Sequence, residues 1–75
     1  MDLTEAFGIV LKDHRLKHNL SQASLAKLAH IDQTAVGLIE RDQRSPSLDT
    51  LEALSRSLNV PLSKLIREAE RIRRQ

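Results

Sequence analysis

The sequence predicts a small all-α domain of five helices, and three observations support that fold class. Apolar residues recur at helical spacing along the 75-residue chain. No stretch alternates apolar and polar residues over a useful length, so the chain carries no strand signal. Residues that typically begin or end helices divide it at Ser21, Asp32, Ser47 and Asn59. We therefore expect one domain over residues 1–75, without an internal linker or repeat.

A first helix is expected to begin near Asp2 or Thr4 and to run to about His18. Its inward face is given by residues at i, i+3, i+4 and i+7, which are Phe7, Val10, Leu11 and His14. Gly8 weakens this helix by about 1 kcal/mol relative to Ala. Asn19 suits the left-handed backbone conformation that ends a helix.

Ser21 is a good N-cap for a second helix. The buried stripe of that helix is expected to be Leu25, Leu28 and Ala29. A turn that joins two helices this tightly needs a residue with positive φ. We assign that conformation to His30, because no glycine is present there and histidine is tolerated in it. Ile31 should then fill the core.

Asp32 is expected to cap a third helix that runs from Gln33 to about Arg41, with Val36 and Ile39 turned inward. Two capped helices separated by a three-residue turn, over residues 21–41, are typical of a helix-turn-helix. The second helix of such a unit is free to enter the major groove of DNA.

After a loop over residues 42–46, Ser47 is expected to cap a fourth helix that ends at Asn59. The inner face of this helix should consist of Leu48, Leu51, Leu54 and Leu58. A fifth helix over about 62–74 carries an apolar stripe of Leu62, Leu65, Ile66, Ala69 and Ile72. Cations in its last turn suit the helix dipole.

Composition narrows the function classes. The net charge is +2, and Phe7 is the only aromatic residue, which disfavours single-stranded nucleic acid because base stacking needs aromatic faces. No cysteine is present, which excludes disulfides and thiolate metal sites and fits a cytoplasmic protein. The longest apolar run is three residues, Ile9 to Leu11, so no signal segment or membrane span is expected. A core this small commonly depends on oligomerisation.

Catalysis is not expected. No pattern sets a nucleophile beside a base, and Gly8 and Gly37 are too few for a phosphate-binding loop, so we expect no enzyme, cofactor or small-molecule ligand. His14 and His18 stand at i, i+4 and could share a metal. Two cations and no carboxylate lie between them, which argues against a dication. The alternative is that His14 packs at the core edge and His18 is solvated, and we expect no metal.

The outer face of the third helix carries residues suited to reading bases. Gln33 can form two hydrogen bonds with adenine, and Thr34 can bond a base or a phosphate. Gly37 permits close approach to the groove. Leu38 has no obvious core role. It either meets thymine methyl groups or packs against the first helix or a partner subunit.

Other polar groups are suited to phosphates, which fix the orientation of a protein on DNA. Ser21 and Gln22 open the second helix, and Gln22 could reach a phosphate or brace Gln33. The residues that would meet the sugar-phosphate backbone after the third helix are Arg41, Gln43 and Arg44. For each Arg taken alone, the alternative is a solvated charge.

Arg15 and Glu40 are expected to form a partly buried, bidentate salt bridge. Glu40 follows Ile39 at the edge of the buried face of the third helix, and Arg15 lies near the end of the first helix. The pair would hold the third helix at a fixed angle.

Residues 11–62 resemble the Cro/C1-type helix-turn-helix of phage repressors and Xre-like bacterial regulators. The residues that carry the resemblance are Arg15, Leu20-Ser21-Gln22, Leu25-Ala26, Ile31, Val36, Ile39-Glu40-Arg41, Arg44, Pro46-Ser47-Leu48, Leu51, Leu54 and Leu58-Asn59-Val60-Pro61. In its size and its Ile31-Asp32 to Thr34 run, the chain is similar to controller proteins of restriction-modification systems. His30 replaces the usual turn glycine, and Asp42 stands where glycine is common, which leaves the path of the following loop open.

The resemblance implies a five-helix, lambda-repressor-like domain that regulates transcription. It implies a homodimer on a pseudo-palindromic operator in double-stranded DNA, with half-sites about 34–36 Å apart. The positions that it matches to DNA contacts are Gln22, Gln33, Thr34, Leu38, Arg41 and Arg44, and those that it matches to a salt bridge are Arg15 and Glu40. The candidate dimer surface is the last helix, through Leu62, Leu65, Ile66 and Ala69. The alternative is an antitoxin-like or protein-interaction module that keeps the fold without binding DNA.

Overall fold

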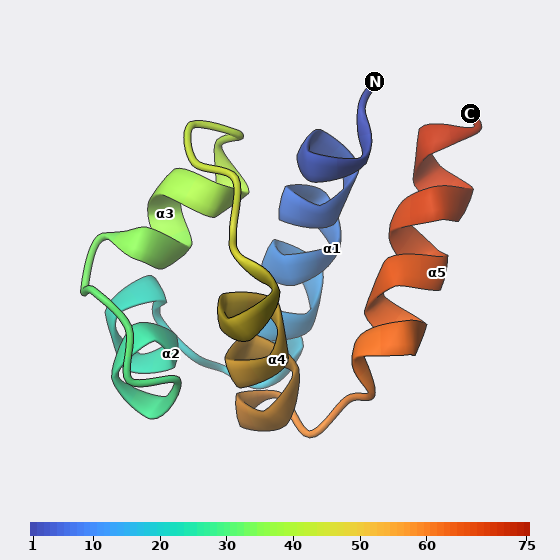
Figure 1. Cartoon of the computed structure of the whole chain (residues 1–75). Helices are drawn as coiled ribbons and strands as arrows, with labels where there is room; N and C mark the ends of the chain where they lie inside the picture. Colours follow the sequence, from blue (N-terminus) through green and yellow to red (C-terminus); the bar gives the residue numbers. More distant parts are fainter.

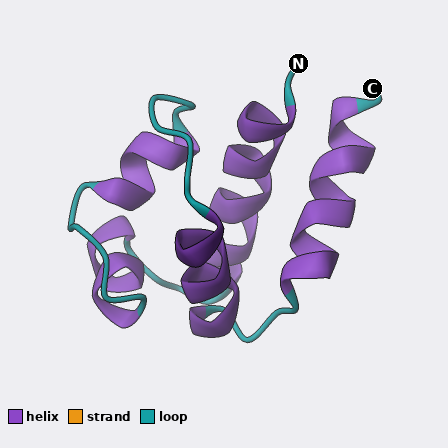
Figure 2. Cartoon of the chain, in the orientation of Figure 1, coloured by secondary structure: helices purple, strands orange, loops and turns teal.

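The computed structural model describes residues 1–75 as five helices joined by short turns, with no strand (Figures 1 and 2). The helices are α1 (Leu3–Lys17), α2 (Gln22–Leu28), α3 (Ala35–Glu40), α4 (Leu48–Ser57) and α5 (Leu62–Arg73). Figure 1 shows α1 between α3 on one side and α5 on the other, and α1 packs against both. The predicted all-α class with five helices is confirmed. None of the helices is both long and apolar enough to span a membrane.

Three helices begin at a side chain that accepts a backbone hydrogen bond. Asp2, Ser21 and Ser47 accept from the N–H three residues later, at 2.8, 3.0 and 3.1 Å. This satisfies one of the free donors at each helix start. The Glu5 N–H and the Thr4 hydroxyl on the Asp2 carboxylate hold its pKa below the ordinary 3.8, because both bonds favour the charged form.

The ends of α1 to α4 share one geometry. Each is followed by a non-glycine residue with φ of 55 or 56°, and these residues are Asn19, His30, Asp42 and Asn59. The N–H of the next residue bonds back to a carbonyl five residues earlier, at 2.8 to 3.2 Å. This is the Schellman arrangement, which satisfies carbonyls at a helix end. The left-handed conformation predicted for His30 is therefore present, and so are the helix ends predicted at Asn19 and Asn59.

All five helices contribute to one core. Its 13 buried members are Ala6, Phe7, Val10, Leu11, Leu25, Ala26, Ala29, Val36, Ile39, Leu54, Leu58, Leu65 and Ala69. Val36 and Ile39 face inward as predicted, and Ile31 is half-buried against the cluster. The turn between α2 and α3 is thereby fixed to the core.

Two predicted core leucines are exposed instead. Leu28 is 54% exposed, because α2 buries an arc centred on Leu25, Ala26 and Ala29 and Leu28 lies beyond the edge of that arc. Leu48 is 73% exposed, because it is the first residue of α4 and the core is reached only further along that helix. The inward assignment of both residues was wrong.

Gly8 sets how closely α1 approaches α3. A Cβ built on Gly8 would lie 2.6 Å from the carbonyl oxygen of Ile39 and 3.0 Å from that of Glu40. Both are backbone atoms, so no side-chain rotation could make room. The glycine that weakens α1 as a helix therefore allows α3 to pack directly on it.

Candidate nucleic-acid interface

The third helix is shorter than predicted, because Asp32 does not cap it. α3 begins at Ala35, and Thr34 occupies the cap position without a side-chain bond to the backbone. The Asp32 carbonyl accepts the Ala35 N–H at 2.9 Å. The Asp32 carboxylate instead accepts the Thr34 hydroxyl at 2.7 Å and lies 3.8 Å from Nη1 of Arg44. Asp32 thus joins two predicted DNA-contacting residues into one exposed cluster.

The predicted ion pair ties α3 to α1. Arg15 Nε donates to Glu40 Oε2 at 2.7 Å and Arg15 Nη2 to Glu40 Oε1 at 3.1 Å. The side chains are 8% and 3% exposed. Arg15 Nη1 also donates to the Leu20 carbonyl at 2.8 Å, so the guanidinium holds the end of α1 as well. Two parallel charge-assisted bonds fix both position and angle.

Gln22 joins the same carboxylate from α2. Its Nε2 donates to Glu40 Oε1 at 3.0 Å. This bond was not predicted: the sequence suggested that Gln22 contacts a phosphate or supports Gln33. Glu40 therefore receives donors from α1 and α2 and holds the helix-turn-helix together through one buried group.

Gly37 lies beneath two side chains. A Cβ added there would meet Gln22 Oε1 at 2.9 Å and Arg41 Nη1 at 3.0 Å. Gly37 is buried, so the predicted direct approach of a DNA groove to its backbone is wrong for this arrangement. The missing side chain instead lets Gln22 and Arg41 lie across α3.

The remaining predicted contact residues are all exposed or half-buried. Arg41 Nε donates to Gln43 Oε1 at 3.4 Å, beside Gly37 and Gln22. The hydroxyl of Ser21 is used as the cap of α2 and donates to Ser24 Oγ at 2.9 Å. The exposed members of the predicted set are Ser21, Gln33, Thr34, Arg41, Gln43 and Arg44, and the half-buried ones are Gln22 and Leu38.

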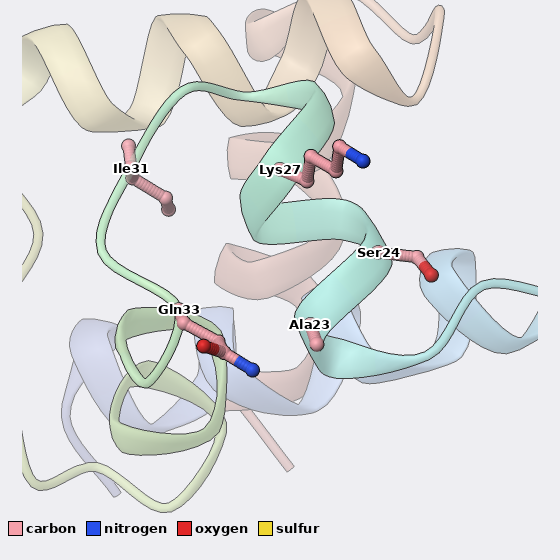
Figure 3. Close-up of a pocket in the computed structure, with 5 residues that line it drawn as sticks. All are labelled: Ala23, Ser24, Lys27, Ile31 and Gln33. Carbon is pink, nitrogen blue, oxygen red and sulfur yellow. The ribbon is translucent and has the colours of Figure 1, made fainter.

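Figure 3 shows a shallow hollow between α2 and the segment that leads into α3. It is lined by Ala23, Ser24, Lys27, Ile31 and Gln33. In this view the Gln33 side chain extends toward Ala23. The sequence reasoning did not include Lys27, whose position three residues after Ser24 could have indicated that it shares that face. The hollow places Gln33 at the junction of the two helices.

The two histidines considered as metal ligands have separate partners. His14 Nε2 lies 2.9 Å from Glu68 Oε1 of α5, and His18 Nδ1 lies 2.9 Å from the His14 carbonyl oxygen. His14 is buried at the α1–α5 contact and His18 is exposed. The structure does not bring the two rings together as a ligand pair.

Two of the four residues predicted for the dimer surface of α5 are buried. Leu65 and Ala69 are fully buried in the chain's own core, so neither can contact a partner, and their assignment was wrong. Leu62 and Ile66 are half-buried and one helical turn apart. Leu62 also lines a shallow hollow with the exposed Leu48. We call the strip of Leu48, Leu62 and Ile66 the α4–α5 apolar strip.

Comparison with known proteins adds three similarities and a family match. The profile of the helix-turn-helix family matches residues 11–65. Control protein C.SmaI of Serratia marcescens is 35% identical over 66 residues, which are 88% of this chain and 79% of that protein. Control protein C.MunI of Mycoplasma sp is 38% identical over 71 residues, 93% of this chain and 96% of that protein. The crystal structure of the restriction-modification controller protein C.AhdI from Aeromonas hydrophila aligns with a TM-score of 0.80 at 35% identity, covering 83% of this chain and 94% of that one.

Proposed function

This chain belongs to the helix-turn-helix family of DNA-binding regulators, and from that premise we propose that it reads a specific double-stranded operator as a homodimer and controls transcription. The similarity to C.SmaI, C.MunI and C.AhdI supports a role as a restriction-modification controller. As a regulator similar to bacterial controller proteins, it would act in the cytoplasm, where bacterial DNA lies. No catalytic step, cofactor or small-molecule effector belongs to this proposal. Control is exerted by protein concentration through dimerisation.

The observation that carries the proposal is the position of Glu40. The carboxylate receives Arg15 from α1 and Gln22 from α2, so the two helices of the helix-turn-helix keep one relative angle. A reading surface gains affinity when it does not have to be ordered on binding.

Base reading is assigned to the residues at the start of α3. Gln33 is exposed, and the oxygen and nitrogen of its side-chain amide can pair with adenine N6 and N7. The Thr34 hydroxyl donates its hydrogen bond to Asp32, so its oxygen remains an acceptor and its methyl group can meet a thymine methyl. Leu38 is half-buried and presents apolar surface to the same groove.

Phosphate contacts are assigned to the exposed groups that flank these readers. Arg41, Gln43 and Arg44 extend the surface beyond the end of α3, and the second N–H of Gln22 extends it at the start of α2. The carboxylate of Asp32 keeps Arg44 beside Thr34. Arg44 therefore lies next to a base reader, where it can meet the backbone of the same base step.

Selection of bound sequences from a random duplex pool tests the specific reading. We expect enrichment of a pseudo-palindrome, whose binding weakens steeply as salt rises because phosphate contacts release counterions. The Gln33→Ala variant should lose preference at one position in each half-site, by about 1–3 kcal/mol. Gln75→Ala, which changes an exposed glutamine at the end of the chain, serves as its control. Absence of binding at low salt would contradict the proposal.

Dimerisation is assigned to the α4–α5 apolar strip. Leu48 is 73% exposed and lines the same hollow as Leu62, and a second copy placed there by two-fold symmetry would cover both strips at once. The Leu48→Asp variant is expected to sediment as a monomer at micromolar concentration and to keep its helical content. Leu28→Asp, at an exposed leucine on α2, is the matched control and should remain a dimer. An unchanged dimer for Leu48→Asp would place the interface elsewhere.

A further inference from the structure

The positive charge of this protein is concentrated in its last helix. Residues 62–75 hold five of the twelve Lys and Arg residues and two of the ten acidic residues, a net charge of +3. The whole chain carries +2, so residues 1–61 carry a net charge of −1. The segment that includes the helix-turn-helix is therefore slightly acidic, and the basic character of the protein belongs to α5.

Four of these cations lie on one side of α5, the last of them at its C-cap. They follow each other at intervals of three, four and three residues, and they are Lys64, Arg67, Arg71 and Arg74. All four are exposed. Leu65 and Ala69, which are fully buried, mark the opposite face of the helix. We call these four residues the α5 cationic stripe.

Neither helix stability nor ion pairing accounts for the stripe. The helix dipole favours cations at the C-terminal end of a helix, which accounts for Arg71 in the last turn and Arg74 at the C-cap. Lys64 lies in the first turn of α5, where the dipole disfavours positive charge and no acidic residue is present, and Arg67 lies mid-helix, where the dipole has little effect. None of the four forms a salt bridge: the structure's five ion pairs all involve other residues.

The stripe points away from the reading surface. In Figure 1, α1 stands between α3 and α5. The buried face of α5 packs on α1, so the stripe lies on the side of α5 that is farthest from α1 and α3. It is also separate from the α4–α5 apolar strip, because Leu62 and Ile66 lie beside the core face of the helix. The stripe therefore remains free when α3 occupies a groove.

We propose that the α5 cationic stripe is a second DNA-binding surface, which holds the phosphate backbone of a separate duplex segment without reading its sequence. Three of the four residues are Arg, whose guanidinium matches phosphate oxygens in pairs. From Lys64 to Arg74 the helix rises about 15 Å, since each residue adds about 1.5 Å. A duplex of that length carries roughly nine phosphate charges, at about one per 1.7 Å.

An acidic protein surface fits the stripe less well than DNA. Protein interfaces have an apolar centre that is sealed from water. The hollow between the stripe residues is lined by Pro61, Ser63, Lys64, Arg67, Glu68 and Arg71, which offer no large apolar side chain. A polar surface that is mainly cationic suits sequence-independent binding to a phosphate backbone.

The test compares two charge-reversal variants of the 75-residue chain. Arg67→Glu with Arg71→Glu removes the centre of the stripe. Lys12→Glu with Lys17→Glu makes the same change in net charge on the exposed face of α1 and is the control. Binding of a labelled random-sequence duplex is measured by fluorescence anisotropy over a range of salt, with circular dichroism melts to show that each variant is folded.

The stripe variant should bind the random duplex at least about tenfold more weakly. Its salt slope should fall by about 1.8, because each cation lost removes about 0.9 from the slope. The control should change less than threefold. In a second assay, the wild type bound to one immobilised duplex should retain a second, differently labelled duplex, and the stripe variant should not. Equal losses in the two variants, or competition by polyglutamate as strong as by duplex at equal charge, would overturn the proposal.

Failure of this proposal and failure of the proposed function give different results. If the selected operator is bound and the stripe reversal changes neither random-duplex affinity nor retention of a second duplex, the second surface is refuted alone. If the stripe reversal abolishes random-duplex binding but selection enriches no sequence, the stripe is supported and the sequence-specific function is refuted.

Discussion

Replacement of Gly8 by Ala has two opposing effects on the free energy of unfolding. Ala is favoured over Gly inside a helix by about 1 kcal/mol, so a free α1 would be stabilised. In the folded protein the added Cβ would lie 2.6 Å from the Ile39 carbonyl oxygen and 3.2 Å from the Glu40 Cα. Ordinary contacts between carbon and a carbonyl oxygen are about 3.3–3.6 Å. The backbones of α1 and α3 must therefore move apart by roughly 0.7 Å on that estimate.

That separation loosens packing on both sides of the contact. An added methyl in a packed core costs about 1–3 kcal/mol, and the upper end applies here because backbone atoms cannot rotate away. The gain in helix propensity offsets about 1 kcal/mol of that cost. The net expectation is a loss of about 2 kcal/mol of unfolding free energy, which for a domain of this size lowers Tm by about 8–16 °C.

Thermal and urea unfolding followed by circular dichroism would measure this loss. Gly37→Ala is the matched control, because the Cβ there meets the mobile ends of Gln22 and Arg41 and no backbone atom. It should change Tm far less than Gly8→Ala does. A Gly8→Ala protein as stable as the wild type would show that α3 does not depend on its close approach to α1, and the reasoning about Gly8 would be wrong.

Three further predictions concern the reading surface and the turn before it. Glu40→Gln leaves the guanidinium of Arg15 buried without a counter-charge and should reduce the unfolding free energy by about 3–5 kcal/mol; a urea midpoint within error of the wild type would contradict it. His30→Gly removes the cost of a left-handed backbone at a non-glycine residue, about 1–2 kcal/mol, but it also raises the conformational entropy of the unfolded chain. A small rise in Tm is therefore expected, and a fall in Tm would show that His30 is not strained. Gly37→Ala should displace Gln22 and Arg41 and weaken operator binding about tenfold, equivalent to about 1.4 kcal/mol. An equal effect of Gly37→Ala in a background that carries both Gln22→Ala and Arg41→Ala would refute that route.

Sequence reasoning succeeded where a structure is decided by near neighbours in the chain. Ser21 and Ser47 cap helices because a hydroxyl reaches an N–H three residues later. Asn59 and His30 end helices because their type tolerates the left-handed backbone. The Arg15–Glu40 pair was also predicted, because Glu40 follows Ile39 at the edge of the buried face of α3 and Arg15 lies near the end of the helix that packs on it.

The errors arose where several local partners competed or where a distant backbone mattered. Asp32 resembles a cap, yet its carboxylate bonds the Thr34 hydroxyl instead, and nothing in the sequence ranks these two acceptor roles. Periodicity placed Leu28 and Leu48 inward, but it gives spacing and not the direction from which the core approaches a short helix. The need for Gly8 depends on the backbone of α3, more than 30 positions away along the chain.

Glu40 explains why this reading surface can be both small and rigid. α3 has six residues, too few to hold itself in place as an isolated helix. The Glu40 carboxylate accepts from Arg15 of α1 at both oxygens and from Gln22 of α2 at Oε1, so α1 and α2 both hold the same group of α3. Gly8 on one side and Gly37 on the other remove the side chains that would block these approaches. Because one buried acceptor joins the three helices, substitutions at Arg15, Gln22 and Glu40 should be coupled and their effects on stability should not add. A double-mutant cycle between Arg15→Ala and Gln22→Ala that gave strictly additive losses would show that the three helices are held independently.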